Sequence, residues 1–448
     1  MNPNIFREYD IRGQVPDELN QETSYRLGLS IGTYYRAHGI QKIVLGRDCR
    51  LSSQELGEAI IKGLTETGMN VVNVGMVPTP LLYFSLYHFD IDGGIQITGS
   101  HNPPEYNGFK ICHNKTTIHG KEIQKIREIG ESGRFNAGQG GVEEKEIINP
   151  YLDYVKTNIQ PGDVPRKVVV DAGNGVGGLV APQVYAMMGV EVVRLFCEPD
   201  GRFPNHHPDP TIPENLEGLM AKIPENSADL GISFDGDADR IGVVDHEGNI
   251  IWGDLLMILF ARDLLDRNPG AKIIGEVKCS QILFDDIKSH GGNPIMWKAG
   301  HSLIKSKMKE EGAMLAGEMS GHLFFAERYF GFDDAIYAGA RLLEIMTRTD
   351  KSIMEFLSDV PKMVNTPEIR LDCPDENKFR VVEALARDFK KDYQVIDVDG
   401  ARVLFDGGWG LIRASNTQPV LVLRFEAHEE NRLQEIRQIF MDKLNQFL

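Results

Sequence analysis

KVVVDAG at residues 167–173 is one of three similar stretches from which the fold of this chain can be predicted. KIVLGRD at residues 42–48 and KIIGEVK at residues 272–278 repeat its pattern, in which a lysine precedes a short apolar run. Short apolar runs that are rich in β-branched residues and end at turn residues indicate buried strands. A pattern that recurs along a chain indicates repeated structural units. We therefore predict three related units built from strands and helices.

Each unit continues in the same way after its first strand. A helical segment follows, and then come two more apolar runs, at residues 69–75 and 93–97, 190–196 and 228–234, and 293–300 and 313–318. Strands that alternate with helices predict mainly parallel sheets, in which sites lie at the carboxyl ends of the strands. The third run of each unit leads into a polar loop, TGSHNP, DGDADR or EMSGH. These loops are the candidate site.

The pattern changes after about Thr366, where several strands and two helices predict a smaller α+β domain with its own polar loop, RASNTQP. We expect three similar α/β domains with mixed, mainly parallel sheets, followed by this smaller C-terminal α+β domain. The expected boundaries give domains at residues 1–145, 146–250, 251–365 and 366–448. Within the first domain, Ser52 and Glu55 predict a capping box at a helix start.

Composition argues against several classes of partner and of site. The 448 residues carry a formal net charge of −17, which argues against nucleic acid and anionic membranes as partners. The five cysteines form no CxxC pair, so we expect neither a disulfide framework nor a zinc cluster. The N-terminal residues lack the apolar core of a signal peptide, and apolar runs are too short to span a bilayer. We therefore expect a cytoplasmic protein.

The loop DGDADR places carboxylates at three alternate positions, Asp235, Asp237 and Asp239. Alternate residues of an extended segment point to the same side, so the three charges would repel one another without a cation. Oxygen ligands favour magnesium or calcium. An EF-hand would need glycine at position six and glutamate at position twelve, where the chain has Arg240 and His246. The alternative is a solvated acidic turn.

Ser100 lies in TGSHNP, directly after the run GGIQI. The GxSxG pattern of a hydrolase would need glycine at the positions of Thr98 and Asn102. A serine hydroxyl is a weak nucleophile unless a base or a metal assists it, so a serine beside a magnesium site indicates a phosphoryl carrier. A divalent ion would also offset the charge of a phosphoserine. The alternative is an ordinary serine in a turn.

Basic residues lie in or beside these loops and could hold phosphate oxygens. They are Arg12, Lys110, Arg240, Lys278, Lys298 and Arg413. The polar residues that follow Arg413 complete a compact candidate cradle for phosphate, namely Ser415, Asn416 and Thr417. His301 and His322 could pass protons near neutral pH, and Glu318 could accept hydrogen bonds from sugar hydroxyls. Surface charges and structural histidines are the alternatives.

Three glycines that follow the first predicted strand of the second unit suggest an alternative interpretation. Gly173, Gly175 and Gly178 satisfy GxGxxG, and Glu191 lies at about the spacing of the acidic residue that contacts a ribose. This motif predicts a dinucleotide site and hence an oxidoreductase. It explains none of the serine, the three aspartates or the basic residues of the other loops. Tight turns between strand and helix account for the glycines equally well.

Taken together and in this order, TGSHNP, DGDADR, GEMSGH and RASNTQP resemble the alpha-D-phosphohexomutase family over essentially the whole chain. The resemblance implies four domains around a central cleft, with Ser100 as the phosphoserine and Mg2+ bound by its phosphate and the three aspartates. It implies that Glu318 and Ser320 recognise the sugar. It assigns the distal phosphate to Arg413, Ser415, Asn416 and Thr417, acid or base work to Lys110 and His322, and further contacts to Tyr9, Arg12, Arg240, Lys278 and His301.

Within this family, Met319 and Asn416 resemble the phosphomannomutase/phosphoglucomutase branch, whereas phosphoglucosamine mutases usually have Gln and Gly there. The resemblance implies an isomerase that interconverts hexose 1-phosphate and hexose 6-phosphate through a hexose 1,6-bisphosphate, which is also its activator. We expect only small hexose phosphates as partners and a monomer, with a dimer as the alternative. A phosphoglucosamine mutase, a dinucleotide-dependent oxidoreductase and a non-catalytic sugar-phosphate-binding protein are the other hypotheses.

Overall fold

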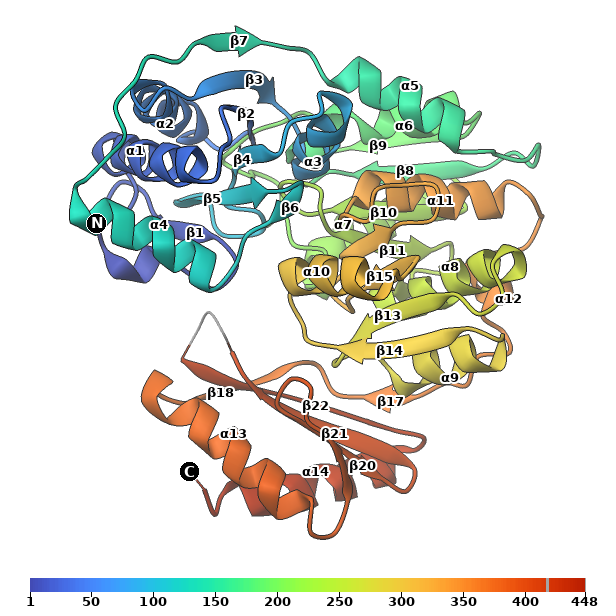
Figure 1. Ribbon diagram of the computed structural model, residues 1–448. Coiled ribbons are helices and arrows are strands. Elements are labelled where there is room, and N and C mark those ends of the chain that lie inside the picture. Colours follow the sequence, from blue (N-terminus) through green and yellow to red (C-terminus); the bar gives the residue numbers. More distant parts are fainter. Residues whose placement is uncertain (416–418, 448) are drawn as a thin grey trace.

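The computed structural model describes residues 1–415 and 419–447 and contains four β-sheets (Figure 1). In the first, β2 (Lys42–Arg47) lies between and parallel to β4 (Gly93–Ile97) and β3 (Asn70–Met76). β5 (Tyr106–His113) returns antiparallel to β4. The sheet is extended by β1 (Ile11–Gln14), β6 (Thr116–Thr117) and β7 (Val142–Glu144).

The second and third sheets repeat this arrangement of three parallel strands and one antiparallel strand. The second has the order β11 (Ile241–Asp245), β10 (Leu230–Phe234), β8 (Lys167–Asp171) and β9 (Glu191–Leu195), with β12 (Ile250–Ile251) beside β11. The third has the order β16 (Leu323–Phe325), β15 (Leu315–Gly317), β13 (Lys272–Glu276) and β14 (Asn293–Trp297). The predicted repeat and its mainly parallel sheets are confirmed.

Helices join these strands and separate the sheets. The first unit contains α1 (Gln21–Ala37), α2 (Ser53–Glu66), α3 (Thr79–His88) and α4 (Lys121–Ser132); the second contains α5 (Ile148–Asn158), α6 (Ala181–Met187) and α7 (Glu217–Glu225). The third contains α8 (Gly253–Arg267), α9 (Gln281–Ser289), α10 (His301–Glu311), α11 (Ala335–Met346) and α12 (Ile353–Phe356). Short 3-10 turns occur at Pro3–Ile5, Val176–Leu179 and Pro213–Leu216.

The predicted capping box at the start of α2 is wrong. The Ser52 side chain makes no capping hydrogen bond; its hydroxyl accepts one of 2.8 Å from the amide of Asn107 instead. Glu55 accepts a hydrogen bond from Gln21 of the neighbouring helix α1. Partners from distant parts of the chain therefore displace the local capping interaction.

The fourth sheet is wholly antiparallel in its described pairings, as expected for the smaller α+β domain. Its main path runs through β17 (Val364–Asn365), β22 (Val420–Ala427), β21 (Gly408–Ala414), β20 (Ala401–Phe405) and β19 (Gln394–Ile396), and β18 (Ile369–Asp372) also pairs with β22. The two helices α13 (Asp375–Phe389) and α14 (Glu430–Leu444) share an apolar core with the sheet.

Side chains alternate across this fourth sheet, as the pleat requires. Val403 and Phe425 pack on the helices, whereas Arg402, Trp409 and Glu426 lie against the third domain. The Arg402 guanidinium donates to the carbonyl oxygens of Val277 and Cys279, both at 2.7 Å. This face of the sheet thus attaches the fourth domain to the third, through both polar and apolar contacts.

One continuous apolar core joins the first three domains, because it contains Leu82 of the first, Ile232 of the second and Leu323 of the third. The fourth domain has a core of its own. All five cysteines are buried and free. In the described parts of the chain, no helix combines the length and the hydropathy that crossing a bilayer requires. The first three domains therefore form one packed body, and the fourth domain packs as a separate unit.

Candidate active site

Ser100 and Asp235 meet where the first and second domains face each other. The Ser100 hydroxyl donates a hydrogen bond of 2.8 Å to Oδ2 of Asp235, and Ser100 is only 2% exposed. Its backbone has a φ of 49°, a left-handed conformation that is uncommon for residues other than glycine. The amide of Ser100 donates to the hydroxyl of Thr98 at 2.8 Å. A strained turn thus aims the hydroxyl of Ser100 at the acidic loop.

A buried arginine holds this turn in place. Arg50 donates hydrogen bonds to four backbone carbonyl oxygens of the loop, those of Ser100, Asn102, Pro103 and Tyr106, at 2.8, 2.5, 2.6 and 2.9 Å. Its Nε lies 3.2 Å from Asp48. A Cβ on Gly99 would approach the guanidinium carbon to 2.5 Å, so this position requires glycine. Sequence reasoning missed Arg50, although it follows β2 at the edge where the site was predicted.

The three aspartates of the acidic loop are fully buried, and one oxygen from each lies within 4.8 Å of the others. The Lys110 ammonium donates to Asp237 at 2.8 Å and also to Asp239. Thr79, at the start of α3, donates to Asp237 at 2.5 Å. The Oδ1 atoms of Asp237 and Asp239 are buried and have no hydrogen-bond partner among the described residues. Such unpaired anionic oxygens fit a divalent cation with hard oxygen ligands.

The charges in this loop are strongly coupled. Burial raises the pKa of Asp235 well above its usual range, and the carboxylates of Asp239 and Asp237 add to the effect. Burial by itself would lower the pKa of Lys110, but Asp237 and Asp239 outweigh it and hold that pKa above its ordinary value. Lys110 is therefore a fixed cation at neutral pH. A bound divalent cation would relieve the repulsion that the single lysine leaves uncompensated.

His322 lies beside the acidic loop, and each of its ring nitrogens lies close to a charged side chain. Arg240 donates from Nε to Nε2 of His322 at 3.0 Å, and Nδ1 of His322 lies 3.1 Å from Oδ2 of Asp333. Because Nε2 accepts from Arg240, a neutral His322 carries its proton on Nδ1, facing Asp333. Asp333 also pairs with Lys305 at 2.8 Å. Asp333 and Lys305 were missed from the sequence, where only the acidic pair before α11 could have drawn attention.

His301 stacks on His322, with ring centroids 5.5 Å apart, and its Nδ1 lies 3.5 Å from Asp333. Burial, together with the charge of Lys305, lowers the pKa of His301 well below its usual value. His301 is therefore a neutral imidazole at physiological pH. His301 therefore offers the site a hydrogen-bonding ring and no positive charge.

The candidate sugar-binding residues form a second group that adjoins the first. Ser320 donates to Glu318 at 3.2 Å, and Glu318 also accepts from the amide of Gly300 at 2.5 Å. Oε2 of Glu318 lies 4.0 Å from Nε2 of His322, which connects the two groups. Nζ of Lys278 lies 3.5 Å from Oε2 of Glu368 in the fourth domain. One carboxylate of the third domain, Glu318, and one of the fourth, Glu368, thus lie among these candidate residues.

The remaining candidates approach from the first and fourth domains. The Tyr9 hydroxyl donates to the carbonyl oxygen of Ala299 at 3.2 Å, and Arg12 donates to Asn102 of the serine loop at 2.5 Å. Arg413 donates from Nε to Asp399 at 2.9 Å. Ser415 is largely buried at the end of β21. Asn416 and Thr417 lie outside the described residues.

The glycines of the GxGxxG pattern pack against the chain itself. A Cβ on Gly178 would lie 2.1 Å from the carbonyl oxygen of Cys197, and one on Gly175 would lie 2.6 Å from that of Gly236 in the acidic loop. Gly173 has a φ of 51°. These close approaches account for the motif without a dinucleotide, and they help to place the acidic loop.

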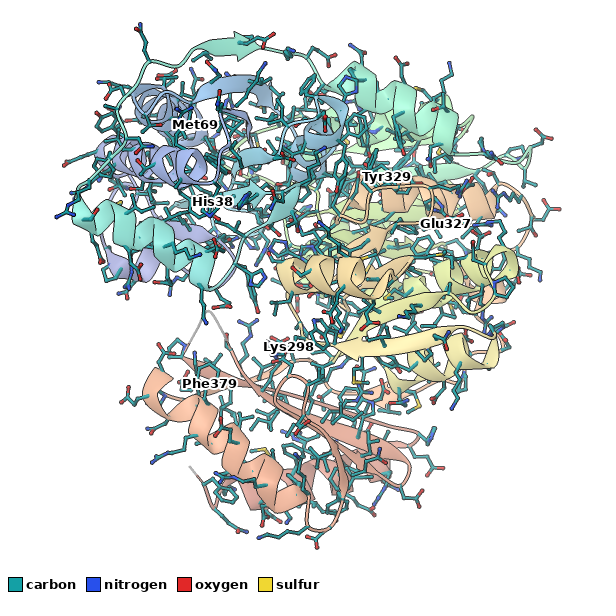
Figure 2. All side chains as sticks on the ribbon, viewed as in Figure 1. His38, Met69, Lys298, Glu327, Tyr329 and Phe379 are labelled. Atoms are coloured by element: carbon teal, nitrogen blue, oxygen red, sulfur yellow. The ribbon has the colours of Figure 1, made fainter. Side chains whose placement is uncertain are left out.

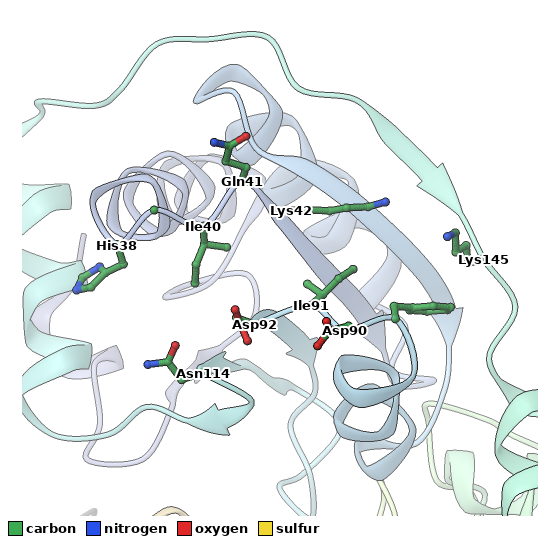
Figure 3. A pocket seen from close by; sticks show the side chains of 11 residues that line it. His38, Ile40, Gln41, Lys42, Asp90, Ile91, Asp92, Asn114 and Lys145 are labelled. Atoms are coloured by element: carbon green, nitrogen blue, oxygen red, sulfur yellow. The ribbon is translucent and has the colours of Figure 1, made fainter.

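Two other features lie apart from these residues. An open pocket of about 540 Å³ lies at the amino ends of β2 and β4, the edge opposite Ser100, and is lined by residues such as His38, Lys42 and Asp92 (Figure 3). Lys298 is exposed at the carboxyl end of β14, where the third domain faces the fourth (Figure 2). Neither feature shares a residue with the groups described above.

Comparisons with known proteins agree with this architecture. Family models described as phosphoglucomutase/phosphomannomutase alpha/beta/alpha domains I, II and III match residues 3–137, 149–248 and 252–364, and the model of the C-terminal domain matches residues 368–443.

Relatives match over nearly the whole chain. A phosphomannomutase/phosphoglucomutase from Pseudomonas aeruginosa is 50% identical over 98% of this chain and 95% of its own length. A phosphoglucomutase from Neisseria gonorrhoeae is 49% identical over 97% and 95%. The crystal structure of a phosphoglucomutase/phosphomannomutase family protein from Burkholderia thailandensis, 44% identical, superposes with a TM-score of 0.94 over 98% of this chain and 97% of that one. The chain therefore belongs to the phosphoglucomutase/phosphomannomutase family.

Proposed function

We propose that the chain is a phosphomannomutase/phosphoglucomutase, an isomerase that interconverts hexose 1-phosphate and hexose 6-phosphate. Ser100 carries the phosphoryl group, and a hexose 1,6-bisphosphate is both intermediate and activator. The observation that carries this proposal is the hydrogen bond of 2.8 Å from the Ser100 hydroxyl to Asp235, which joins a buried serine to a three-aspartate loop. The names of relatives at about half identity support the same activity.

Asp235, Asp237 and Asp239, with the oxygen of Ser100, would hold Mg2+. The buried and unpartnered oxygens of Asp237 and Asp239 fit this ion, because each lacks any donor in the described protein. When bound, Mg2+ would offset the negative charge of the transferring phosphoryl group. Lys110, which pairs with Asp237, and Arg240, which donates to His322, place two positive charges beside the acidic loop.

The arrangement around His322 favours it over Lys110 as the proton acceptor. Lys110 donates to two carboxylates and stays protonated, so it has no lone pair to offer a hydroxyl. His322 has Nδ1 turned toward Asp333, and its Nε2 is an acceptor. Nε2 would take the proton of the attacking sugar hydroxyl when Arg240 turns to the phosphate, and would return it in the second half of the reaction. Lys110 then acts as an electrostatic stabiliser.

The reaction needs the sugar to present first one end and then the other to Ser100. We assign Glu318 and Ser320 to sugar hydroxyls, and Arg413 and Ser415 to the phosphate that is not reacting. Tyr9, Arg12, Lys278 and His301 complete the lining. The fourth domain, attached to the third through polar contacts such as Arg402 with Val277, would open to let the bisphosphate turn.

The remaining expectations stay proposals. They are the four domain boundaries given above, a cytoplasmic location, a monomer, and hexose phosphates as the only partners. The free state of all five cysteines supports a reducing compartment. Met319 lies between Glu318 and Ser320 in the sequence and contacts Arg424. We assign Glu318, Met319 and Ser320 to one side of the site, the sugar-binding wall, where mannose, glucose and glucosamine would be distinguished.

A coupled assay tests the proposal. It compares glucose 1-phosphate, mannose 1-phosphate and glucosamine 1-phosphate, with Mg2+ and glucose 1,6-bisphosphate present, in wild type, Ser100→Ala and the exposed control Ser289→Ala. We expect turnover of the glucose and mannose substrates, loss of turnover in Ser100→Ala, and no change in the control. Faster turnover of glucosamine 1-phosphate would favour a phosphoglucosamine mutase. Binding without isomer exchange would identify a non-catalytic protein, and nicotinamide fluorescence on titration would favour an oxidoreductase.

A further inference from the structure

A single residue of the third domain, Ala299, contacts both the first and the fourth domains through its backbone. The N–H of Ala299 donates to Oδ2 of Asp399 at 3.1 Å, and the carbonyl oxygen of Ala299 accepts from the hydroxyl of Tyr9 at 3.2 Å. Ala299 lies between β14 and α10, whereas Asp399 lies in the turn before β20. The two polar groups of one residue thus link three domains.

Oδ2 of Asp399 also accepts a hydrogen bond from Arg413, the arginine that is the candidate ligand of the distal phosphate. Nε of Arg413 donates to Oδ2 of Asp399 at 2.9 Å, and both side chains are mostly buried, with 11% and 15% of their surface exposed. A guanidinium anchored through Nε directs the edge formed by its two terminal nitrogens away from the anchor. That edge has the fork geometry that binds phosphate oxygens in a bidentate manner.

The turn that carries Asp399 is built against Arg413. Gly400 has a φ of 81°, and a Cβ there would lie 2.8 Å from Cα of Arg413 and 2.2 Å from the carbonyl oxygen of Ile412. Only glycine allows the turn to pack this closely. The position of Asp399 relative to Arg413 is therefore set by backbone contact and not by side-chain choice alone.

The residue after Ala299 extends the connection to the sugar-binding wall. The amide of Gly300 donates to Oε1 of Glu318 at 2.5 Å. Gly300 has a φ of 127°, and a Cβ there would lie 2.8 Å from the Tyr9 ring. Two consecutive amides therefore bind two carboxylates, one beside the phosphate arginine and one in the sugar-binding wall. A shift of residues 299–300 would move both.

We propose that Asp399 is a positioning residue for substrate binding. It orients the Arg413 side chain and, through Ala299 and Gly300, fixes the position of Arg413 relative to Glu318. The inference rests on the proposed function only in taking Arg413 as a ligand of the distal phosphate. Hexose 1-phosphate and hexose 6-phosphate would each bind with their single phosphate at Arg413. Loss of Asp399 therefore weakens the binding of both isomers and leaves the transfer step at Ser100 intact.

Calorimetric titration of the full chain with glucose 6-phosphate tests this role. All proteins carry Ser100→Ala, so that no turnover contributes heat. We expect Asp399→Asn to raise Kd about tenfold, since the substitution removes the charge from the acceptor of the Arg413 hydrogen bond. Asp397→Asn is the matched control, because Asp397 lies two residues away and pairs only with Lys390 on the surface among its described contacts. It should leave Kd within about twofold.

A double-mutant cycle with Arg413→Ala separates positioning from a general effect on the domain. Residues that act through one another are non-additive, so Asp399→Asn should add little to the loss caused by Arg413→Ala. An undiminished effect of Asp399→Asn in the Arg413→Ala background would overturn the proposal, and so would wild-type affinity in Asp399→Asn alone. In proteins with an intact Ser100, the proposal further requires KM to rise for both isomers while kcat changes less than about threefold.

Hydrogen exchange checks the link to Ala299. Asp399→Ala removes the acceptor, so peptides that cover residues 298–301 should exchange at least about tenfold faster than in wild type, with Asp397→Ala unchanged. Unaltered protection would refute the Ala299 link. A wild-type chain that binds glucose 6-phosphate without isomerising it would refute the proposed function and leave this inference standing. A wild-type chain that does not bind it at all would overturn both.

Discussion

The guanidinium of Arg50 donates a hydrogen bond of 2.8 Å to the carbonyl oxygen of Ser100, the candidate phosphoryl carrier. Three further carbonyl oxygens of the same loop accept from this side chain, and Asp48 balances its charge. Arg50 is 2% exposed, so these bonds are shielded from water. The left-handed turn at Ser100 is therefore held by a side chain that touches no substrate in the proposed reaction.

Arg50→Lys should separate loop positioning from stability. Lysine keeps a positive charge near Asp48 but lacks the planar fork that reaches several carbonyl oxygens. We expect kcat to fall roughly 10- to 100-fold, because small misplacements of a reacting group are costly, while the melting temperature falls only modestly. Arg50→Met leaves Asp48 as an uncompensated buried charge and should cost about 3–5 kcal/mol of stability. Wild-type kcat in Arg50→Lys would refute the positioning role.

Asp237→Asn should weaken the magnesium dependence of the reaction. The substitution removes one carboxylate of the acidic loop while keeping an acceptor for Thr79. We expect the Mg2+ concentration for half-maximal rate to rise at least about tenfold. Asp200→Asn is the control, since Asp200 pairs with Arg202 on a surface loop. An unchanged Mg2+ titration would show that the acidic loop is not the metal site.

Asp333→Asn should lower kcat far more than it changes KM. Asp333 lies 3.1 Å from Nδ1 of His322, so its loss frees the ring to adopt the other tautomer. General-base catalysis contributes typically 10²–10⁴-fold, and we expect kcat to fall by about 10²-fold. Asp286→Asn is the control, because Asp286 also pairs with a basic residue and a histidine, Arg262 and His290, away from the site. Equal kinetic effects of the two variants would contradict the assignment.

Asp334 should make the stability of the protein depend on pH between about 4 and 6. Burial raises the pKa of Asp334 to about 6, although it accepts hydrogen bonds from Tyr151 and Tyr329. In the unfolded chain the pKa is about 3.9, so between these values the folded state binds more protons. The free energy of unfolding therefore decreases as the pH rises through this window.

Asp334→Asn isolates that contribution, because asparagine resembles the protonated acid. Relative to this variant, wild type should lose up to about 3 kcal/mol of unfolding free energy between pH 4 and pH 7, which is the two-unit pKa difference expressed as free energy. Urea denaturation at several pH values measures it, with the surface variant Asp397→Asn as the control. Parallel stability curves for wild type and Asp334→Asn would contradict the expected linkage.

Features that depend on neighbouring residues could be predicted from the sequence, whereas features that depend on residues far apart in the chain could not. The strand repeat was predictable, because the apolar runs at β2, β8 and β13 are local patterns and parallel strands place their carboxyl ends at one edge. The capping box at Ser52 failed, because Asn107 supplies a partner from another strand. Arg50 and Asp333 were missed, because nothing local distinguishes them from other charged residues.

The order of residues is enough to show which chemical groups are present and at which strand ends they lie: a serine, three carboxylates, and the basic residues beside them. Which of these groups touch depends on the packing of the domains. Ser100 meets Asp235, Lys110 divides its bonds between Asp237 and Asp239, and Ala299 joins Tyr9 to Asp399. The physical reason is that strand and helix periodicity are local properties of the chain. A hydrogen bond between residues a hundred or more positions apart depends instead on how whole domains pack.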